Sequence, residues 1–209
     1  MTRPPRDLAT SDCEHCRDGF ITQPVNTASS LAYVASGAAL LRGVRSLPAA
    51  RRPAARALGW SVVAAGIGSV AYHGPGGRFA HWTHDASVIA MLGFSAVATA
   101  ADRADREAPP MAALVAVPLL AGLAAHPRTS GPAQAVAGVV VAAGEIDRVA
   151  RSGRAGPEAA AWLAAMVAYG LGRSDAPTCR PDSLVQPHAA WHALSALALW
   201  LRARSTAVG

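Results

Sequence analysis

Apolar positions along this chain gather into seven long runs separated by short polar breaks. The runs cover residues 25–43, 57–73, 83–101, 110–126, 132–148, 157–172 and 184–202. The breaks are rich in proline, glycine and arginine, and the first two of these residues end helices and mark turns. A helix that crosses a bilayer needs roughly 20 apolar residues, with about 17 as the lower limit. The pattern predicts an all-α membrane protein, a bundle of seven transmembrane helices, or six if 110–126 or 132–148 is re-entrant.

The same pattern predicts one domain. Residues 1–24 form a polar segment ahead of the first run, residues 25–203 form the bundle, and residues 204–209 form a short tail. Of the 209 residues, 52% are hydrophobic and 15% are charged, whereas about 25% of an ordinary soluble chain is charged. We therefore expect this apolar chain to be embedded in a lipid bilayer.

Basic residues give the expected orientation of the bundle. The net charge is +6, all 19 basic residues are arginines, and no nucleic-acid-binding motif accompanies them. Nucleic acid is therefore not an expected partner, and the arginines are better interpreted as a topology signal. An outside N-terminus places twelve arginines on the inner face and seven on the outer face. Because inner loops carry the excess of basic residues, we expect the N-terminus outside and the C-terminus in the cytoplasm.

Three polar groups lie inside or at the edges of the apolar runs, where polar side chains are costly and usually functional. Ser69 and His73, in GIGSVAYH, are four residues apart and share a helix face. Asp85 opens the third run in HDASVIAM. His188 and His192, in QPHAAWHALSALALW, have the i, i+4 spacing that can chelate a metal ion. Taken singly, each group has a plainer interpretation: buried side chains satisfied inside the bundle, or a carboxylate that caps a helix.

The antiparallel order of seven helices brings these groups to one face of the membrane. The second run ends there, and the third and seventh runs begin there, so we expect His73, His188 and His192 to converge on one metal ion. Three histidines and a water form an open catalytic zinc site, in which the water ionises near neutral pH. Asp85 is the expected proton acceptor. Ser69 is the expected donor to a developing oxyanion or the residue that orients a ligand.

The combination and order of these segments resemble a known family. CEHC with QPVNTASS, GIGSVAYH, Asp85 and QPHAAWHALSA are similar to motifs of the CREST superfamily of membrane hydrolases, which includes the alkaline ceramidases and is related to the adiponectin receptors. The likeness is greatest to the alkaline-ceramidase branch. It implies a seven-helix fold, zinc held by three histidines, and hydrolysis of the amide bond of ceramide-type lipids. The residues that match the family's site are His73, His188, His192, Ser69 and Asp85.

The N-terminal segment departs from that family. Alkaline ceramidases carry a calcium site there, built from several acids and an asparagine around the CE motif and from a later glutamate. Here Glu14 and Asp12 are the candidate ligands, but Cys16 stands where the asparagine is expected, and Gln23 lies near the place of the glutamate. Calcium requires several hard oxygen ligands. Zinc is therefore the expected cofactor, and a calcium site has little support.

The chain has three cysteines, Cys13, Cys16 and Cys179. In the expected topology Cys13 and Cys179 both lie on the outer face, where an oxidising compartment permits a disulfide. The family likeness also suggests a bridge between the N-terminal segment and the loop before the last helix, which these two cysteines would form. Cys16 is the rival partner, and CEHC could instead bind a metal through its cysteines and His15.

Other polar residues have plain expected roles. His81 and His84 are expected in an outer loop at the membrane interface. Glu145 and Asp147 lie beside Arg148 near the inner face and are expected to form a surface ion pair with it.

These features together predict a zinc-dependent intramembrane hydrolase that cleaves the amide bond of ceramide or a related N-acyl lipid with a zinc-activated water. The expected location is a bacterial plasma membrane, with the site near the outer leaflet. Two other classes stay open: a heptahelical metal-binding receptor or sensor without turnover, and a haem-binding or transport protein of the membrane. Zinc with no released product would indicate the receptor, and a Soret band would indicate haem.

Overall fold

The computed structural model describes residues 8–103 and 111–208, and this part of the chain folds into seven α-helices. They are α1 (Pro24–Gly43), α2 (Arg52–His73), α3 (Arg78–Arg103), α4 (Met111–Ala124), α5 (Ser130–Ser152), α6 (Pro157–Leu171) and α7 (Pro187–Val208). Two short 3-10 turns, Val44–Ser46 and Ala49–Arg51, connect α1 to α2. The prediction of an all-α fold with seven long helices is confirmed.

Prolines and glycines set several helix ends. Pro24, Pro157 and Pro187 are the first residues of α1, α6 and α7, where the missing N–H and the fixed φ of proline suit the first helical turn. The seventh apolar run, 184–202, therefore starts three residues before its helix. At the other end of α5, Gly153 adopts a left-handed φ of 65° and closes the helix, a conformation that glycine tolerates without steric cost.

The start of α3 corrects a prediction. His81 and His84 were expected in a loop, but α3 already begins at Arg78, so both histidines lie in its first turns. Gly76 and Gly77 have φ values of 66° and 104°, and these conformations reverse the chain over a very short connection. The apolar pattern missed the first turn of the helix because Arg78 and His81 interrupt it next to the glycines of the break.

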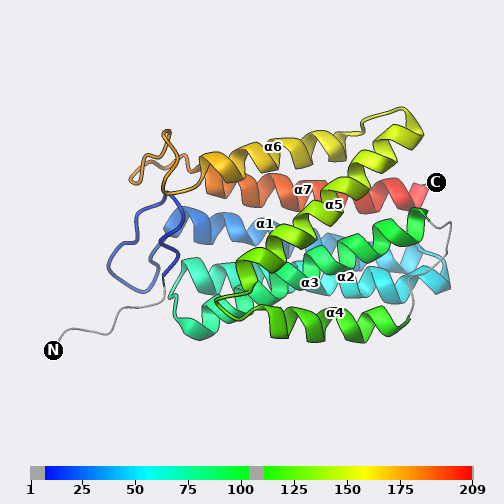
Figure 1. Cartoon of the computed structure of the whole chain (residues 1–209), viewed down its shortest axis with the longest axis horizontal. Helices are drawn as coiled ribbons and strands as arrows, with labels where there is room; N and C mark the ends of the chain where they lie inside the picture. Colours follow the sequence, from blue (N-terminus) through cyan, green and yellow to red (C-terminus); the bar gives the residue numbers. More distant parts are fainter. Residues whose placement is uncertain (1–7, 104–110, 209) are drawn as a thin grey trace.

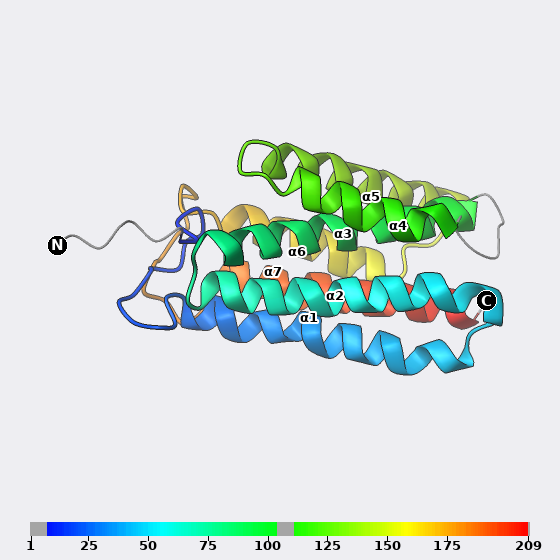
Figure 2. The ribbon, with the colours of Figure 1, turned by 90° about the horizontal axis from the view of Figure 1, so that it is seen from below.

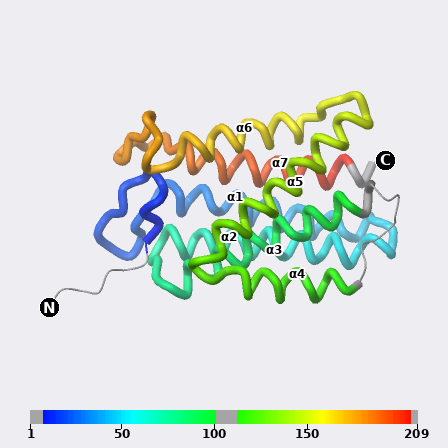
Figure 3. Tube along the Cα trace, in the orientation of Figure 1, coloured from blue at the N-terminus to red at the C-terminus, as the bar shows by residue number. Residues whose placement is uncertain are grey.

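The helices alternate in direction along the chain (Figure 1). α1 packs against α2 and α7, α2 packs against α3, α6 packs against α7, and α3 packs against α4 and α5. Figure 2 shows α4 and α5 on the side of the bundle away from α1. The N-terminal segment, residues 8–23, lies at the same end as the α2–α3, α4–α5 and α6–α7 connections, and α7 ends at the opposite end (Figure 3).

Glycine allows α1 and α2 to pack closely. A Cβ atom added at Gly66 of α2 would lie 2.8 Å from the backbone nitrogen of Val34 and 3.1 Å from the carbonyl oxygen of Ser30, both on α1. Real Cβ atoms are not found so near to backbone, so any larger residue must push the two helices apart. Ser30 also lies beside His192, and the close packing therefore helps to define the site at this end of the bundle.

We expect Gly66→Ala to lower the free energy of unfolding by about 1–3 kcal/mol, because the added methyl group overpacks the contact between α1 and α2. Gly138→Ala, in α5, is the matched control. An added Cβ at Gly138 meets nothing within 4 Å, so this change should be neutral or stabilise the helix by about 0.5–1 kcal/mol. Thermal unfolding followed by circular dichroism measures both, and equal melting temperatures for the two variants would contradict the expected packing.

A buried ionic network replaces the expected surface ion pair. Glu145 of α5 binds Arg148 at 2.8 Å and Arg202 of α7 at 2.8 Å, and Arg148 also binds Glu158 of α6 at 2.6 Å. Glu145 and Glu158 are only 8% and 3% exposed. The sequence suggested a surface pair because it could not show that Glu158 of α6 and Arg202 of α7 lie beside these residues of α5.

One helix among the described residues is long and apolar enough to cross a membrane by length and composition, the 25-residue stretch Ala49–His73. A shorter apolar helix covers Ala112–Ala124. A single such helix is weak evidence, since the core helix of a soluble protein passes the same test. The fold is therefore a seven-helix bundle, in which helix length and composition mark one helix, and not all seven, as able to cross a membrane.

Candidate metal centre

Three histidines from α2 and α7 meet at one end of the bundle. His73 is the last residue of α2, and His188 and His192 lie in the first two turns of α7. One ligand nitrogen from each ring lies within 4.8 Å of the others, and the ring centroids are 4.6–5.2 Å apart. All three side chains are buried. The structure thus brings together the three residues that the sequence proposed as metal ligands.

The nitrogens that face this group lack hydrogen-bond partners. Nε2 of His73, Nε2 of His192 and both nitrogens of His188 are buried without one. Buried polar atoms are nearly always paired, because an unpaired one costs free energy. Three buried imidazoles with unpaired nitrogens close together are the donor set that a divalent transition metal prefers. The residues therefore fit a metal ion, and zinc is among the ions they suit.

The tautomer of His73 follows from its neighbour Gln23. The Gln23 amide nitrogen donates to the carbonyl oxygens of Ala9, at 2.9 Å, and Glu14, at 2.8 Å. Its oxygen Oε1 therefore faces Nδ1 of His73, 2.6 Å away, and can only accept. The proton of the neutral ring must then reside on Nδ1, which leaves a lone pair on Nε2. Outer partners of this kind orient metal-binding histidines.

The same reasoning applies to His192. Ser29 Oγ lies 2.9 Å from Nδ1 of His192 and donates its own proton to the carbonyl oxygen of Asn26, at 3.0 Å. Ser30 donates to the same carbonyl and lies 3.4 Å from Nδ1. Each hydroxyl has one proton, so Ser29 accepts from the ring and Nε2 keeps its lone pair. These roles of Gln23 and Ser29 were not predicted from the sequence. The feature that could have indicated them is the polar segment QPVNTASS, which contains both residues and opens an apolar run.

Asp85 does not join the three histidines. Its Oδ1 accepts hydrogen bonds from Nδ1 of His84, at 2.9 Å, and from the Gln134 amide of α5, at 3.1 Å. Its Oδ2 lies 3.3 Å from Nε2 of His81. The ring of His84 lies near both groups: it is bonded to this carboxylate, and its centroid is 6.1 Å from that of His73. The predicted acid thus approaches the histidines through His84.

Ser69 is buried on α2, one turn before His73. Its position follows from the i, i+4 spacing that the sequence already displayed, since residues four apart lie on one face of a helix. The structure records no bond that would assign it a role.

The nearby ring of Tyr72 stacks on both His81 and His84, each with centroids 4.8 Å apart, and holds the first turn of α3 against the end of α2.

The two candidate calcium ligands serve different parts of the structure. Both oxygens of Glu14 accept backbone N–H groups at the start of α1, from Val25 at 2.8 Å and from Asn26 at 2.7 Å. A carboxylate there satisfies the otherwise unpaired donors of the first helical turn. Asp12 faces His73 and His188 instead. Burial raises the pKa of Asp12 to about 7, although the positive charge of Arg173 opposes the rise.

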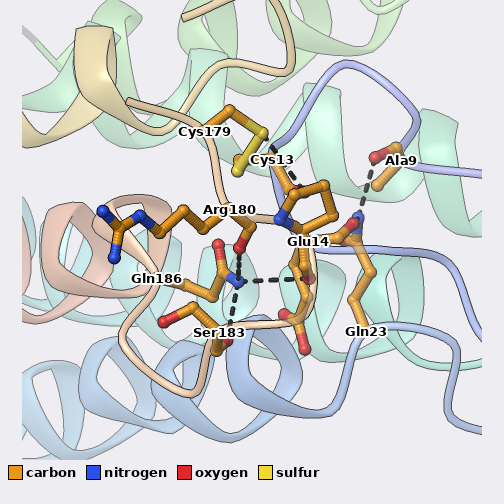
Figure 4. Close-up of a disulfide and its surroundings, with 9 residues drawn as sticks. Ala9, Cys13, Glu14, Gln23, Cys179, Arg180, Ser183 and Gln186 are labelled. Carbon is orange, nitrogen blue, oxygen red and sulfur yellow. Dashed lines mark hydrogen bonds between the residues drawn. A yellow bond between two sulfur atoms is a disulfide. The ribbon is translucent and has the colours of Figure 1, made fainter. Parts of the chain in front are cut away.

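A disulfide holds the N-terminal segment over this end of the bundle. Cys13 and Cys179 are bonded across 166 residues of sequence, and Cys16 is free. Figure 4 shows the bridge beside Glu14, Gln23 and Gln186. The backbone N–H of Cys13 also donates to the carbonyl oxygen of Gly172 at 2.8 Å. The pairing that the family likeness suggested is thus the one found, and it ties the segment to the α6–α7 loop.

Comparison with models of protein families and with curated proteins finds no match for this chain. The chemistry that the site can perform has to follow from its residues. Three neutral imidazoles are residues that would hold a divalent cation. A histidine–carboxylate pair, His84 and Asp85, lies next to them. With a metal ion bound, such a set of residues could serve proton transfer beside an activated water.

Proposed function

We propose that the chain is a membrane-embedded bundle whose helices all cross the bilayer, with the N-terminal segment outside. The helices α4, α5 and α6 support this proposal, because each carries several exposed large apolar side chains. These are Val115, Leu119, Leu120, Leu123, Val136, Val139, Val140, Ile146, Leu163, Met166 and Val167. Soluble monomers rarely expose apolar patches of this extent, and the hydrocarbon core of a membrane is the partner that suits them.

Buried polar residues explain why most of these helices have a modest mean hydropathy. α1 buries Asn26 and Ser30, and α7 buries His188, His192 and Ser195. An average over a window counts these residues, although none of them would face lipid. A bundle with polar side chains inside and apolar side chains outside is the arrangement expected in a bilayer.

We infer that the centre is a zinc site that hydrolyses a lipid. The observation that carries this is the set of unpaired nitrogens on His73, His188 and His192, two of them with tautomers fixed by Gln23 and Ser29. His73, His188 and His192 would hold the ion, and the chemistry that zinc would supply there is activation of a water near neutral pH.

The residues around the centre have distinct roles in this proposal. His84 accepts the proton of the water on the ring nitrogen opposite Asp85, and Asp85 holds the ring and stabilises the imidazolium that forms. His84 then returns the proton to the leaving nitrogen of the amide. Ser69 donates a hydrogen bond to the oxyanion. Water adds across the C–N bond, and a fatty acid and an amine leave.

The choice of an N-acyl lipid such as ceramide rests on the resemblance of the sequence motifs to the alkaline ceramidases. It agrees with a site at the end of the bundle on the N-terminal side, where a lipid in the outer leaflet would present its head group. Glu14 is bonded to backbone N–H groups of α1 and Asp12 faces the histidines, so we propose zinc as the metal of the activity.

The test uses the purified full chain in lipid nanodiscs. Zinc is quantified by elemental analysis, and the protein is incubated separately with ceramide, another N-acyl lipid and a phospholipid. We expect one zinc per chain and release of a fatty acid and a sphingoid base, measured by mass spectrometry. Zinc with lipid binding but no product would favour the receptor alternative, and a protein without metal would overturn the proposal.

A further inference from the structure

Asp12 is the acid closest to the three histidines, and nothing in the proposed reaction uses it. Its Oδ1 lies 3.3 Å from Nδ1 of His188, and its Oδ2 lies 3.7 Å from Nδ1 of His73. The residue is only 6% exposed. It belongs to the N-terminal segment rather than to any helix, so its presence at this centre depends on how that segment is held.

The segment holds Asp12 firmly. Asp12 forms an antiparallel backbone bridge with Arg173, and the next residue, Cys13, is both hydrogen-bonded to Gly172 and bonded to Cys179. These contacts come from the end of α6 and the loop before α7. The loop that leads into α7, the helix of His188, is therefore attached to the segment that carries Asp12.

His188 is the histidine of the three whose outer nitrogen lacks a hydrogen-bond partner. Nδ1 of His73 faces Gln23, and Nδ1 of His192 faces Ser29, whereas Nδ1 of His188 is unpaired. The Asp12 carboxylate oxygen Oδ1 lies 3.3 Å from this nitrogen and is the acceptor nearest to hand for its proton. A carboxylate that accepts from a histidine fixes the tautomer of the ring and strengthens its other nitrogen as a ligand.

We propose that Asp12 is a positioning residue of the metal centre: it accepts the Nδ1–H of His188 and directs Nε2 of that ring to the cation. The inference rests on the proposed zinc site. Its second effect is on charge. Three neutral imidazoles leave the charge of a divalent cation uncompensated in a buried place, and a carboxylate beside two of the rings offsets part of it.

The test measures zinc affinity by competition with a chelator, with no reference to turnover. Asp12→Ala should weaken zinc binding about 10- to 100-fold, the loss typical of removing an outer partner of a metal ligand. Asp12→Asn keeps an acceptor oxygen and should lose less. Asp18→Ala, an exposed acid of the same segment, should bind zinc as the unmodified chain does.

A double variant distinguishes positioning from a separate structural role. If Asp12 acts mainly through His188, then Asp12→Ala should weaken zinc binding much less in the His188→Ala background than in the unmodified chain, with only the charge effect left, because the two changes are not additive. Full additivity, or normal zinc affinity in both Asp12 variants, overturns the inference and leaves the zinc site standing. An unmodified chain that binds no zinc overturns the proposed function as well. The Cys13–Cys179 bridge, checked by mass under non-reducing conditions, reports whether each variant is folded.

Discussion

His192→Ala is expected to abolish stoichiometric zinc binding and to lower lipid hydrolysis by a factor of about 10³ or more. The variant removes one of three ligand nitrogens, and the metal supplies several kcal/mol of stabilisation to the transition state. His192 is fully buried and bonded to Ser29 of α1, so the loss should be local to the centre. Elemental analysis and product release from ceramide measure the two effects on the same preparation.

Removing a buried ring can also disturb folding, and the controls address this. His126→Ala replaces an exposed histidine outside the centre and should keep both zinc and activity. Ser29→Ala removes only the outer partner of His192 and should weaken zinc binding about 10- to 100-fold while the helices stay intact. Normal zinc content in a well-folded His192→Ala protein would rule out the three-histidine site.

Asp85→Asn is expected to leave zinc bound and to lower turnover about 10²- to 10⁴-fold, the range for loss of a general acid–base group. Asp85 lies beside His84 and is not one of the clustered ligands, so the metal should be retained. The asparagine still fits between His84, His81 and Gln134, but it carries no charge to stabilise a protonated His84. Its amide can also donate to Nδ1, which would favour the wrong tautomer of the ring.

Two further variants test whether Asp85 acts through His84 and whether the effect is specific to Asp85. His84→Gln should lose turnover to a similar extent, because the proposal places the proton on His84 and gives Asp85 a supporting role. Asp175→Asn, an exposed acid in the α6–α7 loop, should be unchanged. If Asp85→Asn lacks activity but His84→Gln retains it, then Asp85 acts without His84 and the relay is wrong. Normal turnover in Asp85→Asn would remove both residues from the reaction.

Much of the fold could be predicted from the sequence because helices are local structures. Apolar runs and the prolines and glycines between them predicted seven helices, and the structure has them with ends shifted by a few residues. The larger shifts are at the starts of α2 and α3 and at the end of α7, where turns that contain arginine belong to the helix. Hydropathy could not assign these turns, since an arginine is compatible with a helix and with a loop alike.

The candidate ligands could also be predicted, because their signals are local or follow from helix order. His188 and His192 are one turn apart, and the alternation of helix directions was enough to bring His73 to the same end. The partners of these rings could not be found in this way. Gln23 and Ser29 lie 50 and 163 residues from the histidines they orient, and no spacing rule connects residues so distant.

By itself, then, the sequence determined the helical class, the number of helices and which three imidazoles share one end of the bundle. The first two depend on side chains a few residues apart, and the third follows from the opposite directions of successive helices. Only the tertiary structure decided that Asp12 faces His188, that Asp85 contacts His84, and that Glu145 lies in a buried network with Arg148 and Arg202. These contacts depend on how helices rotate about their axes and on where a disulfide draws the N-terminal segment. Both depend on the packing of side chains throughout the bundle, which no local sequence pattern describes.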